Sequence, residues 1–337
     1  MTVRELYNIL LNEIREGKIS GMLPSISQMK IKYRTSHTTI HLAVDRLKMR
    51  GVVYGRQGKG VFVRQNAGPG GKTDTVLLYS CLPQLIMKPF YTKFWAGLKD
   101  DLQSSGKNLE LSSQLDGDLR RYAAAIVLGA NLMEKGELEM LRDALSGKIC
   151  LLNHRQEGYV SVCNDNFRGG GLAAEKLYAA GHRRVGIISC FLELPRNFFH
   201  ERFEGFMAFA RKHPAMHCHE FPANEKDQNI RRAVAEILDH HPEITGIFAF
   251  KDLLAFDFQQ SVQSSGRVFS IVGYDNQEFS RLTDPPLTTV EEDCTGLSRA
   301  LSETIAGLIA GKNVCSRDIP PRLIERESVI NIRKKHN

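Results

Sequence analysis

The stretch Gly181-His182-Arg183-Arg184-Val185-Gly186-Ile187-Ile188-Ser189 decides the fold of the larger part of the chain, because it joins a helical pattern to a strand pattern. Residues 170–180, just before it, carry apolar side chains at helical spacing, and residues 185–189 form a short apolar run. Alternation of amphipathic helices with buried strands is typical of a parallel sheet that has helices on both faces.

The same alternation continues on both sides of this stretch. The predicted strands are 76–79, 124–128, 149–153, 160–163, 185–189, 246–250 and 269–273. The predicted helices are 94–104, 136–145, 170–180, 201–212, 230–240 and 253–264. A region as long as 75–337 predicts an α/β fold of two doubly wound lobes.

Positive charge is concentrated at the N-terminus. Residues 1–64 hold 12 Lys and Arg against 4 Asp and Glu, a net charge of +8, whereas the whole chain of 337 residues carries +7. A compact basic module attracts polyanions, and nucleic acid is the commonest of these. We therefore expect a DNA-binding domain at 1–64, a linker at 65–74 and a separate body at 75–337.

The basic module has the pattern of a winged helix-turn-helix. Its predicted helices are 3–16, 26–33 and 37–50, and its predicted strands are 52–54 and 61–63. Ser25 and Ser36 are placed to cap the second and third helices. The two strands flank the basic, Gly-rich tip 55–60, which predicts a hairpin that contacts DNA beside the third helix.

Short motifs in the module point to one family. They are Leu23-Pro24-Ser25, Ser36, Thr38-Thr39-Ile40, Ala43, Leu47, Gly51 and Arg56-Gln57-Gly58-Lys59-Gly60 before Phe62-Val63. In this order they resemble the winged helix of the GntR family of bacterial transcriptional regulators. The family usually has arginines where this chain has Ser27, His37 and His41, so the resemblance implies a different operator or affinity. The DNA contacts that it implies are Ser25, Ser27, Arg34, Ser36, His37, Thr38, Thr39, His41, Arg46, Arg56, Gln57, Gly58 and Lys59.

The body carries a second ordered set of motifs. They are Asp165-Asn166, Gly169-Gly170, Gly181-His182-Arg183-Arg184-Val185, Arg202-Phe203-Glu204-Gly205-Phe206, Ile271-Val272-Gly273-Tyr274-Asp275-Asn276, Pro285-Pro286-Leu287-Thr288-Thr289-Val290 and Leu323-Ile324-Glu325-Arg326-Glu327-Ser328. These motifs resemble the effector domain of the LacI/galactose-repressor family. The resemblance implies a periplasmic-binding-protein-like fold of two lobes, with an effector between them at the carboxyl ends of the strands. A GntR-type reader on such a body is similar to the arabinose-type repressors.

The resemblance also implies how the lobes divide the chain. One lobe is expected at about 75–155 plus 287–316 and the other at about 156–284 plus 317–337, with crossovers near 153–158, 283–289 and 317–321. Only residues 112–123 separate Leu111 from the strand predicted at 124–128, and the family normally has a full helix in this interval. We therefore expect the N-terminal lobe to be trimmed at one edge.

Five residues match effector-binding positions of that family: Phe90, Tyr91, Arg202, Lys251 and Asp275. The resemblance implies that Arg202 donates to effector oxygens, that Asp275 accepts from sugar hydroxyls, and that Phe90 and Tyr91, in the loop after the first strand, face a sugar ring. The alternatives are a salt bridge between lobes for the charged pair and core packing for the aromatic pair. Lys251 replaces a usual Asn and favours an acidic or phosphorylated sugar, with a neutral sugar as the alternative.

The predicted function is a ligand-responsive transcriptional regulator, a repressor that binds double-stranded operator DNA as a homodimer and needs no cofactor. A sugar-acting enzyme is one alternative, although no nucleophile, base and orienting acid stand at motif spacing. A regulator that has lost effector sensing is another. No apolar run of ~20 residues and no signal-type segment is present, so we expect a cytoplasmic protein with no membrane partner.

Metal ligands and disulfides are not expected. His213, His217, Cys218 and His219 crowd together, but Pro214 interrupts any helix that could align them and no second cluster accompanies them. The chain has seven cysteines, an odd number without Cys-x-x-Cys spacing, and we expect them to be reduced.

Overall fold

The computed structural model describes residues 1–49, 52–56, 60–63, 74–82, 89–115, 118–194, 197–223 and 229–333. The chain forms two compact units, one built on Met1–Thr73 and the other on Asp74–Leu115 with Tyr122–Asn337. The first unit is called the head and the second the body. Among the described residues, no helix is both long enough and apolar enough to cross a bilayer.

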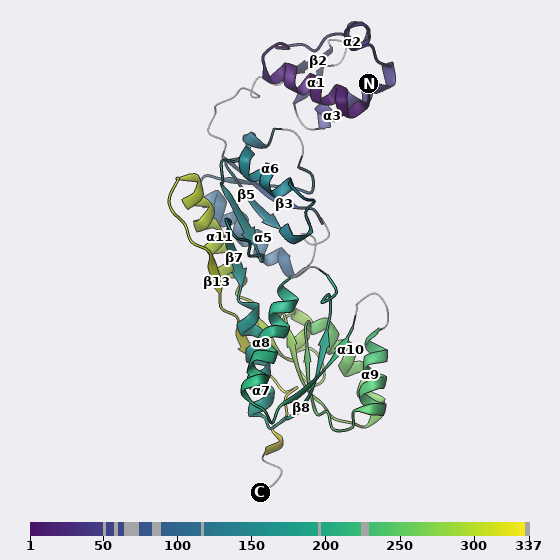
Figure 1. Ribbon diagram of the computed structural model, residues 1–337, viewed down its shortest axis with the longest axis vertical. Coiled ribbons are helices and arrows are strands. Elements are labelled where there is room, and N and C mark those ends of the chain that lie inside the picture. Colours follow the sequence, from purple (N-terminus) through teal and green to yellow (C-terminus); the bar gives the residue numbers. More distant parts are fainter. Residues whose placement is uncertain are drawn as a thin grey trace. The chain divides into compact units, whose positions relative to one another are not determined.

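The head consists of three helices and one antiparallel hairpin (Figure 1). The elements are α1 (Val3–Arg15), α2 (Ile26–Tyr33), α3 (His37–Met49), β1 (Val53–Arg56) and β2 (Gly60–Val63). The hydroxyls of Thr2, Ser25 and Ser36 each accept a hydrogen bond from the backbone N–H three residues later, which satisfies donors at each helix start. The three helices predicted for the head are confirmed.

The hairpin of the head is longer than predicted. Its ladder pairs Val53 with Val63 and Arg56 with Gly60, so residues 55, 56 and 60 belong to the strands and not to the tip. The connection between α1 and α2 supports it, since Met22 forms an antiparallel bridge with Phe62. The tip residues 57–59 lie outside the described part of the chain, as does the predicted linker 65–74 apart from its last residue.

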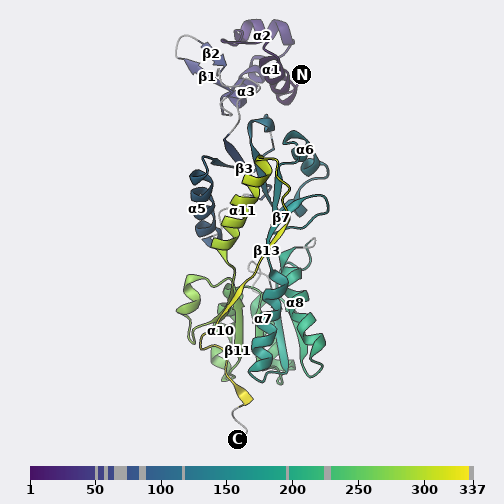
Figure 2. The same ribbon diagram turned by 90° about the vertical axis from the view of Figure 1, so that its left-hand side faces the viewer.

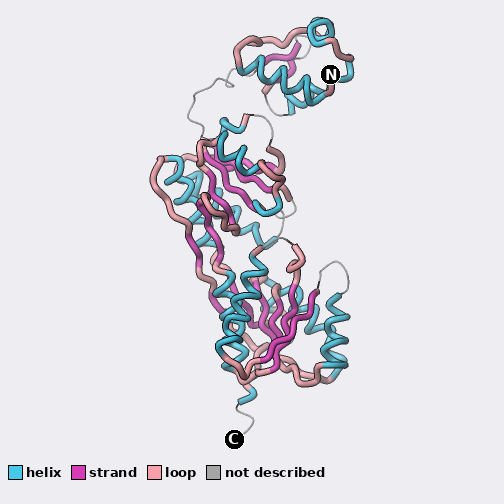
Figure 3. Tube along the Cα trace, in the orientation of Figure 1, coloured by secondary structure: helices cyan, strands magenta, loops and turns pink. Residues whose placement is uncertain are grey.

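The body contains two six-stranded sheets, one in each lobe (Figure 3). The N-terminal lobe has the parallel order β13-β7-β6-β5-β3-β4, and the C-terminal lobe has the order β14-β12-β11-β10-β8-β9, in which only the β12–β14 pair is antiparallel. The first sheet comprises β3 (Thr75–Ser80), β4 (Asn108–Ser112), β5 (Ala124–Leu128), β6 (Ile149–Leu152), β7 (Val160–Asn164) and β13 (Arg317–Ile319). The second comprises β8 (Arg184–Ser189), β9 (His217–Pro222), β10 (Gly246–Ala249), β11 (Ser270–Tyr274), β12 (Thr288–Glu291) and β14 (Arg322–Ile324). The predicted α/β class with two doubly wound lobes is confirmed.

Helices cover both faces of each sheet. In the N-terminal lobe, α5 (Pro89–Ser104) and α11 (Cys294–Ile309) lie side by side on one face and α6 (Glu137–Ala144) lies on the other (Figure 2). In the C-terminal lobe, the pair α7 (Asn166–Ala179) and α8 (Phe198–Lys212) covers one face, and the pair α9 (Asn229–His240) and α10 (Asp252–Val262) covers the other (Figure 1). Short 3₁₀ turns complete the described part: η1 (Leu119–Arg121), η2 (Ala130–Leu132), η3 (Gln263–Ser265) and η4 (Glu278–Arg281).

Three predicted helices begin earlier in the structure than apolar periodicity indicates, because two of them start at polar caps and the third starts at a proline. Asp165 caps α7 and Asn197 caps α8, each by accepting a backbone N–H, and Pro89 is the first residue of α5. Phe90 and Tyr91 therefore belong to α5, and the prediction that they lie in a loop is wrong. No full helix lies between β4 and β5 in the described residues, so the expected trimmed edge is confirmed.

The positions predicted for the first two crossovers between the lobes are wrong. β7 pairs with β6 in the N-terminal sheet, so the chain leaves that lobe after Asn164 and not at 153–158. β12 pairs with β11 in the C-terminal sheet, so the return crossover lies at 292–293 and not at 283–289. The third crossover, between β13 and β14, falls within the predicted 317–321. An apolar run reveals a strand but does not reveal which sheet the strand joins.

Glycines explain part of the motif pattern of the body. A Cβ at Gly170 would lie 1.9 Å from the carbonyl oxygen of Arg202, and a Cβ at Gly205 would lie 1.8 Å from that of Phe167. A side chain at either position would therefore collide with backbone, so α7 and α8 cross with their main chains in contact. This close crossing carries Arg202 to the side chain of Asn166.

Candidate functional site

The exposed start of α3 carries polar side chains on one face of the head. His37, Thr38 and His41 are exposed, and the two imidazole rings lie 4.6 Å apart between centroids, as expected for residues one helical turn apart. Ile40 and Leu47, on the opposite face, are fully buried in the head core. One face of α3 is thus exposed, whereas the opposite face packs in the core of the head.

The other predicted DNA contacts are placed as follows. Arg34 is exposed and ends α2 in the left-handed region with φ 47°, and Ser25, Ser27, Ser36 and Arg46 are also exposed. The hydroxyl of Thr39 is only partly accessible and lies 2.8 Å from the hydroxyl of Ser36, so Thr39 completes the start of α3. The backbone of Arg56 is in β1, but its side chain and the residues 57–59 lie outside the described part.

In the body, Arg202 is buried at the centre of a polar cluster. It projects from α8, is 2% exposed, and stacks its guanidinium on the ring of Tyr274 at 3.5 Å. Its Nε donates to Asn166 Oδ1 at 2.8 Å, and its Nη1 donates to the carbonyl oxygen of Phe250 at 2.6 Å. Nη1 also lies 3.4 Å from Asp275 Oδ1. Arg202 and Asp275 are thus brought together as predicted, but both lie in the C-terminal lobe, so their salt bridge does not join the lobes.

Glu292 is the second acid that Arg202 contacts, and it links two crossovers. Its Oε1 accepts from Arg202 Nη2 at 2.9 Å, and its Oε2 accepts from Asn164 Nδ2 at 2.8 Å. Burial raises the pKa of Glu292 to about 7, against the opposite effect of the Arg202 charge. Asn164 ends β7, where the chain leaves the N-terminal lobe, so this cluster ties both passages of the chain to α8. A further ion pair, Arg155 Nη1 to Glu201 Oε1 at 2.5 Å, joins the lobes directly.

Asp275 stands in a strained loop at the carboxyl end of β11. Its φ is 106° and that of Asn276 is 46°, conformations that cost free energy for residues with side chains and that concentrate at functional sites. The buried carboxylate of Asp252 supports this loop by accepting from the N–H of Gln277 at 2.7 Å and from the hydroxyl of Thr289 at 2.5 Å. Burial, followed by the charge of Asp275, raises the pKa of Asp252 to about 8.

Lys251 lies next to this cluster and is only 7% exposed. Its ammonium lies 4.7 Å from the ring centre of Phe191 and 5.2 Å from that of Phe199, a cation–π arrangement. Arg202 contacts the same Phe199 ring at 5.2 Å. The structure therefore brings Arg202, Lys251 and Asp275 together at one edge of the C-terminal lobe. Phe90 and Tyr91 are in α5, but their side chains lie outside the described part.

A pocket of about 860 Å³ opens between the lobes beside Asp275. Its walls come from α5 and the start of α11 in the N-terminal lobe, and from the loop after β11 and the end of β12 in the C-terminal lobe. The acidic residues on the walls are Asp100, Asp101, Asp275, Glu278, Glu291, Glu292 and Asp293, and the basic residues are Arg299 and Arg322. The pocket lies at the carboxyl ends of strands, where open α/β sheets bind ligands.

The comparisons with known proteins agree with this architecture. A family model described as a periplasmic binding protein-like domain matches residues 174–329. The chain is 24% identical over 264 residues to the ribose operon repressor of Haemophilus influenzae, a match that covers 73% of this chain and 79% of the relative. The body is therefore similar to the periplasmic-binding-protein-like part of LacI-type transcriptional regulators.

Solved structures of LacI-type proteins share the fold. A LacI-family transcriptional regulator from Enterococcus faecium with bound ribose is 25% identical, with a TM-score of 0.64, over 77% of this chain and 99% of its own. The complex of the regulator CelR with cellobiose is 20% identical, with a TM-score of 0.64, over 91% of this chain and 100% of its own, and supports the fold alone. The family model begins at residue 174 and leaves the head untested, so the resemblance of the head to the GntR family remains a proposal.

Sequence reasoning missed the residues that hold the site together. Glu292, Asn164 and Asp252 are buried polar residues, and a buried polar side chain requires hydrogen-bonding partners that the sequence does not identify. The motif Asp165-Asn166 was a usable signal, because Asn166 proves to be the acceptor for Arg202. No disulfide joins any of the seven cysteines, all of which are in the described residues, and Cys150, Cys163 and Cys190 are buried.

Proposed function

We propose that this LacI-type regulator reads operator DNA with a GntR-type winged helix-turn-helix at its N-terminus and senses a small molecule in the pocket between its lobes. One observation carries the proposal: the same chain contains a basic head and a LacI-type body. The head has a net charge of +8 and an exposed face on α3, and the body has an open pocket beside Asp275. The head has one acid for every three bases, so it favours a polyanion.

The geometry of the head supports contact with DNA through α3 and the hairpin. In a winged helix-turn-helix, the second helix of the motif enters the major groove and the adjacent hairpin reaches the backbone or the minor groove. Here α2 and α3 form that motif, and β1 and β2 follow directly. His37, Thr38 and His41 are then the candidates for base contacts. A homodimer is proposed because a single reader of this kind contacts only one half-site.

The effector that best fits the pocket is a neutral, hydroxyl-rich molecule of the sugar class. The charged residues on the walls of the pocket are mainly acidic, so a phosphate or carboxylate group of the effector would be repelled. The two basic side chains near the pocket, Arg202 and Lys251, already interact with groups of the protein. Arg202 makes four hydrogen bonds within the protein, and Lys251 packs on two aromatic rings. Carboxylates such as Asp275 accept hydrogen bonds from sugar hydroxyls.

The test combines operator selection with an effector screen. Full-length protein selects its site from random duplexes, and neutral sugars, sugar acids and sugar phosphates are then added to the complex. We expect at least one neutral sugar to change the operator affinity of the wild type and not that of Asp275→Ala, whereas the exposed-residue control Asp143→Ala responds normally. Absence of sequence-selective DNA binding would refute the regulator proposal, and a response to sugar phosphates alone would refute the effector class.

A further inference from the structure

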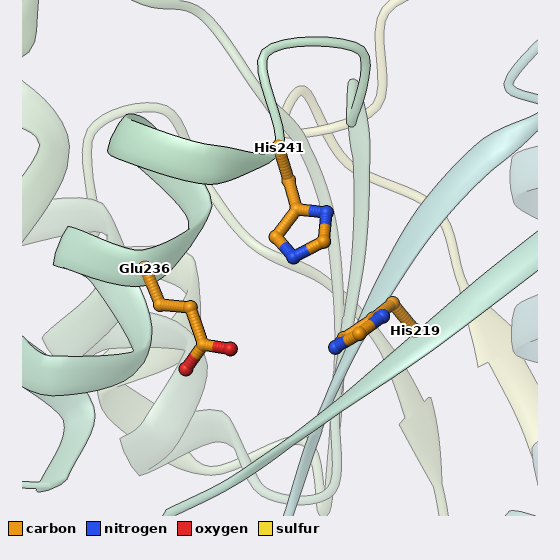
Figure 4. A group of neighbouring side chains, drawn as sticks. All are labelled: His219, Glu236 and His241. Atoms are coloured by element: carbon orange, nitrogen blue, oxygen red, sulfur yellow. The ribbon is translucent and has the colours of Figure 1, made fainter.

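Three side chains with metal-binding atoms converge on the outer edge of the C-terminal lobe (Figure 4). His219 comes from the edge strand β9, Glu236 from α9, and His241 from the residue that follows α9. One ligand atom of each lies within 4.8 Å of the others, and no other such group of three occurs in the described residues. We propose that this group binds one divalent transition-metal ion of the Zn²⁺ class, and we call it the His-Glu-His group.

The chemistry of the donors determines which ions fit. Two imidazole nitrogens and one carboxylate suit Zn²⁺, Co²⁺ or Ni²⁺, whereas Mg²⁺ and Ca²⁺ prefer sites made of oxygen alone. An ion bound to all three would lie about 2.0–2.2 Å from each donor, so modest rotations of these side chains complete the site. His219 and Glu236 are both exposed. Three protein ligands leave a further position for water.

Packing already orients the two imidazole rings. The ring of His219 lies 4.4 Å from that of His241 and 4.6 Å from that of Phe221, which is buried beneath them. His241 Nδ1 lies 3.5 Å from Glu243 Oε1, and its Nε2 turns toward Glu236 and His219 (Figure 4). A carboxylate on the far nitrogen is the usual partner of a metal-binding histidine, because it fixes the tautomer and the ring orientation.

The backbone under these residues is also held in place. Arg267 donates hydrogen bonds to four carbonyl oxygens at the end of α9, those of Ile237, His241, Pro242 and Ile244. His219 is in register with Gly186 of β8 through the parallel β8–β9 ladder. Two of the ligands therefore stand on anchored main chain, which lowers the entropy cost of assembling the site.

This group differs from the histidine cluster visible in the sequence. His213 ends α8 and stacks on Phe209 at 4.0 Å, away from the ligand set. Cys218 points to the other face of β9 from His219, because side chains alternate along a strand. The proposed site therefore contains nitrogen and oxygen donors only. Its partners for His219 lie 17 and 22 residues further along the chain, a spacing that no local metal motif contains.

A bound ion would tie α9 to the edge strand β9. Because the ion binds the folded lobe and not the unfolded chain, binding must raise the thermal stability of the protein. His219 stands on β9, the edge strand of the sheet, and none of the three ligands is among the residues that line the pocket beside Asp275, so the group is separate from that pocket.

The experiment titrates metal-free, full-length protein with Zn²⁺ against a chromophoric chelator and records thermal unfolding with and without the ion. We expect one ion per chain and a rise in Tm of at least about 2 °C for the wild type. His219→Ala and His241→Ala should each weaken binding at least about tenfold, as should Glu236→Gln. Mg²⁺ should neither bind nor shift Tm.

Matched variants separate this site from adventitious binding. His240→Ala and Asp239→Asn, both exposed at the end of α9, should bind Zn²⁺ like the wild type, and so should Cys218→Ala and Cys315→Ala. The spectrum of the Co²⁺ protein should lack the near-ultraviolet charge-transfer band that thiolate ligands produce. The proposal is overturned if the wild type binds no Zn²⁺, if His219→Ala and His241→Ala bind as tightly as the wild type, or if the thiolate band appears.

Discussion

Arg202 and Glu292 form a buried ion pair of 2.9 Å at the place where the two lobes join. Arg202 stands on α8 of the C-terminal lobe, and Glu292 stands on the crossover that leads into α11 of the N-terminal lobe. The second oxygen of Glu292 accepts from Asn164, on the other crossover. A ligand that moves Asp275 would act on a residue 3.4 Å from the same guanidinium. This connects the pocket wall to the joint between the lobes.

Removing Arg202 should therefore destabilise the body strongly. Arg202→Ala leaves the carboxylate of Glu292 buried without its cation, and breaking one partner of a buried pair costs about 3–5 kcal/mol of unfolding free energy. The double variant Arg202→Met with Glu292→Leu should recover part of this loss, because neither residue of the pair then leaves an unpaired charge. Denaturant unfolding measures both effects.

The control for this prediction is Arg317→Ala, which removes a surface ion pair with Glu303 at 2.5 Å. Because that pair is exposed, its loss should cost only about 0–1 kcal/mol. Equal losses for Arg202→Ala and Arg317→Ala would contradict the structural role assigned to the buried pair.

Gly205→Ala should separate α7 from α8. The new Cβ would lie 1.8 Å from the carbonyl oxygen of Phe167, and neither helix backbone has room to yield without moving the other. Overpacking of this kind costs about 3 kcal/mol or more of unfolding free energy where backbone must shift. Because α8 carries Arg202, any effector response should be lost together with stability. Thermal unfolding and the effector assay record the two consequences.

Gly171→Ala is the matched variant on the facing helix. A Cβ there would lie 3.8 Å from the carbonyl oxygen of Gly205, an ordinary contact, so it should be neutral or stabilise by up to about 1 kcal/mol. If the two glycine variants unfold at the same temperature, the backbone contact between α7 and α8 is not as close as described.

Most strands and helices of the body could be predicted from the sequence, because apolar runs and helical periodicity indicate which residues of a segment are buried. β5 was predicted with its exact bounds, whereas β9 was missed, because its sequence His217-Cys218-His219-Glu220-Phe221-Pro222, at the edge of the sheet, contains no apolar run. α11 was also missed, although its buried residues Leu297, Leu301 and Ile305 recur at helical spacing where the helix packs beside α5 and against the sheet.

The site was predicted in part. Arg202 and Asp275 were found because they belong to ordered motifs, and the structure brings them within 3.4 Å. The crossovers and Glu292 were not found, since sheet membership and buried hydrogen-bonding partners depend on contacts between distant segments. Lys251 was predicted to favour an acidic or phosphorylated sugar, but its ammonium packs on aromatic rings contributed by other segments.

The carboxyl of Asp252 should make stability depend on pH. Its folded-state pKa is raised from 3.8 to about 8, so the native state binds a proton that the unfolded state has lost, and stability falls as the pH rises through this window. The raised pKa of Glu292 also makes stability fall as the pH rises, but only up to about pH 7. The slope contributed by Asp252 should be about 1.4 kcal/mol per pH unit below about pH 7, and it should fall to about half of that value at about pH 8.

Asp252→Asn should remove that slope while keeping the loop in place. The amide oxygen still accepts from the N–H of Gln277, and the amide nitrogen donates to the hydroxyl of Thr289, so both contacts survive. Denaturant unfolding at several pH values compares this variant with the wild type and with the exposed control Asp239→Asn. An identical pH dependence for all three proteins would show that Asp252 is ionised throughout the range.

His41→Arg should strengthen DNA binding and steepen its dependence on salt. His41 is exposed on α3 one turn from His37, where the GntR pattern usually has arginine, so the variant restores a permanent charge toward the phosphate backbone. One added phosphate contact raises the slope of log affinity against log salt by about 0.9. Asn8→Arg places the same charge on an exposed position of α1, and it should change affinity less and leave the slope nearly unchanged. Operator titrations between low and high salt compare the three proteins. If Asn8→Arg and His41→Arg have equal effects, the added charge acts only at long range and α3 is not the helix that faces DNA.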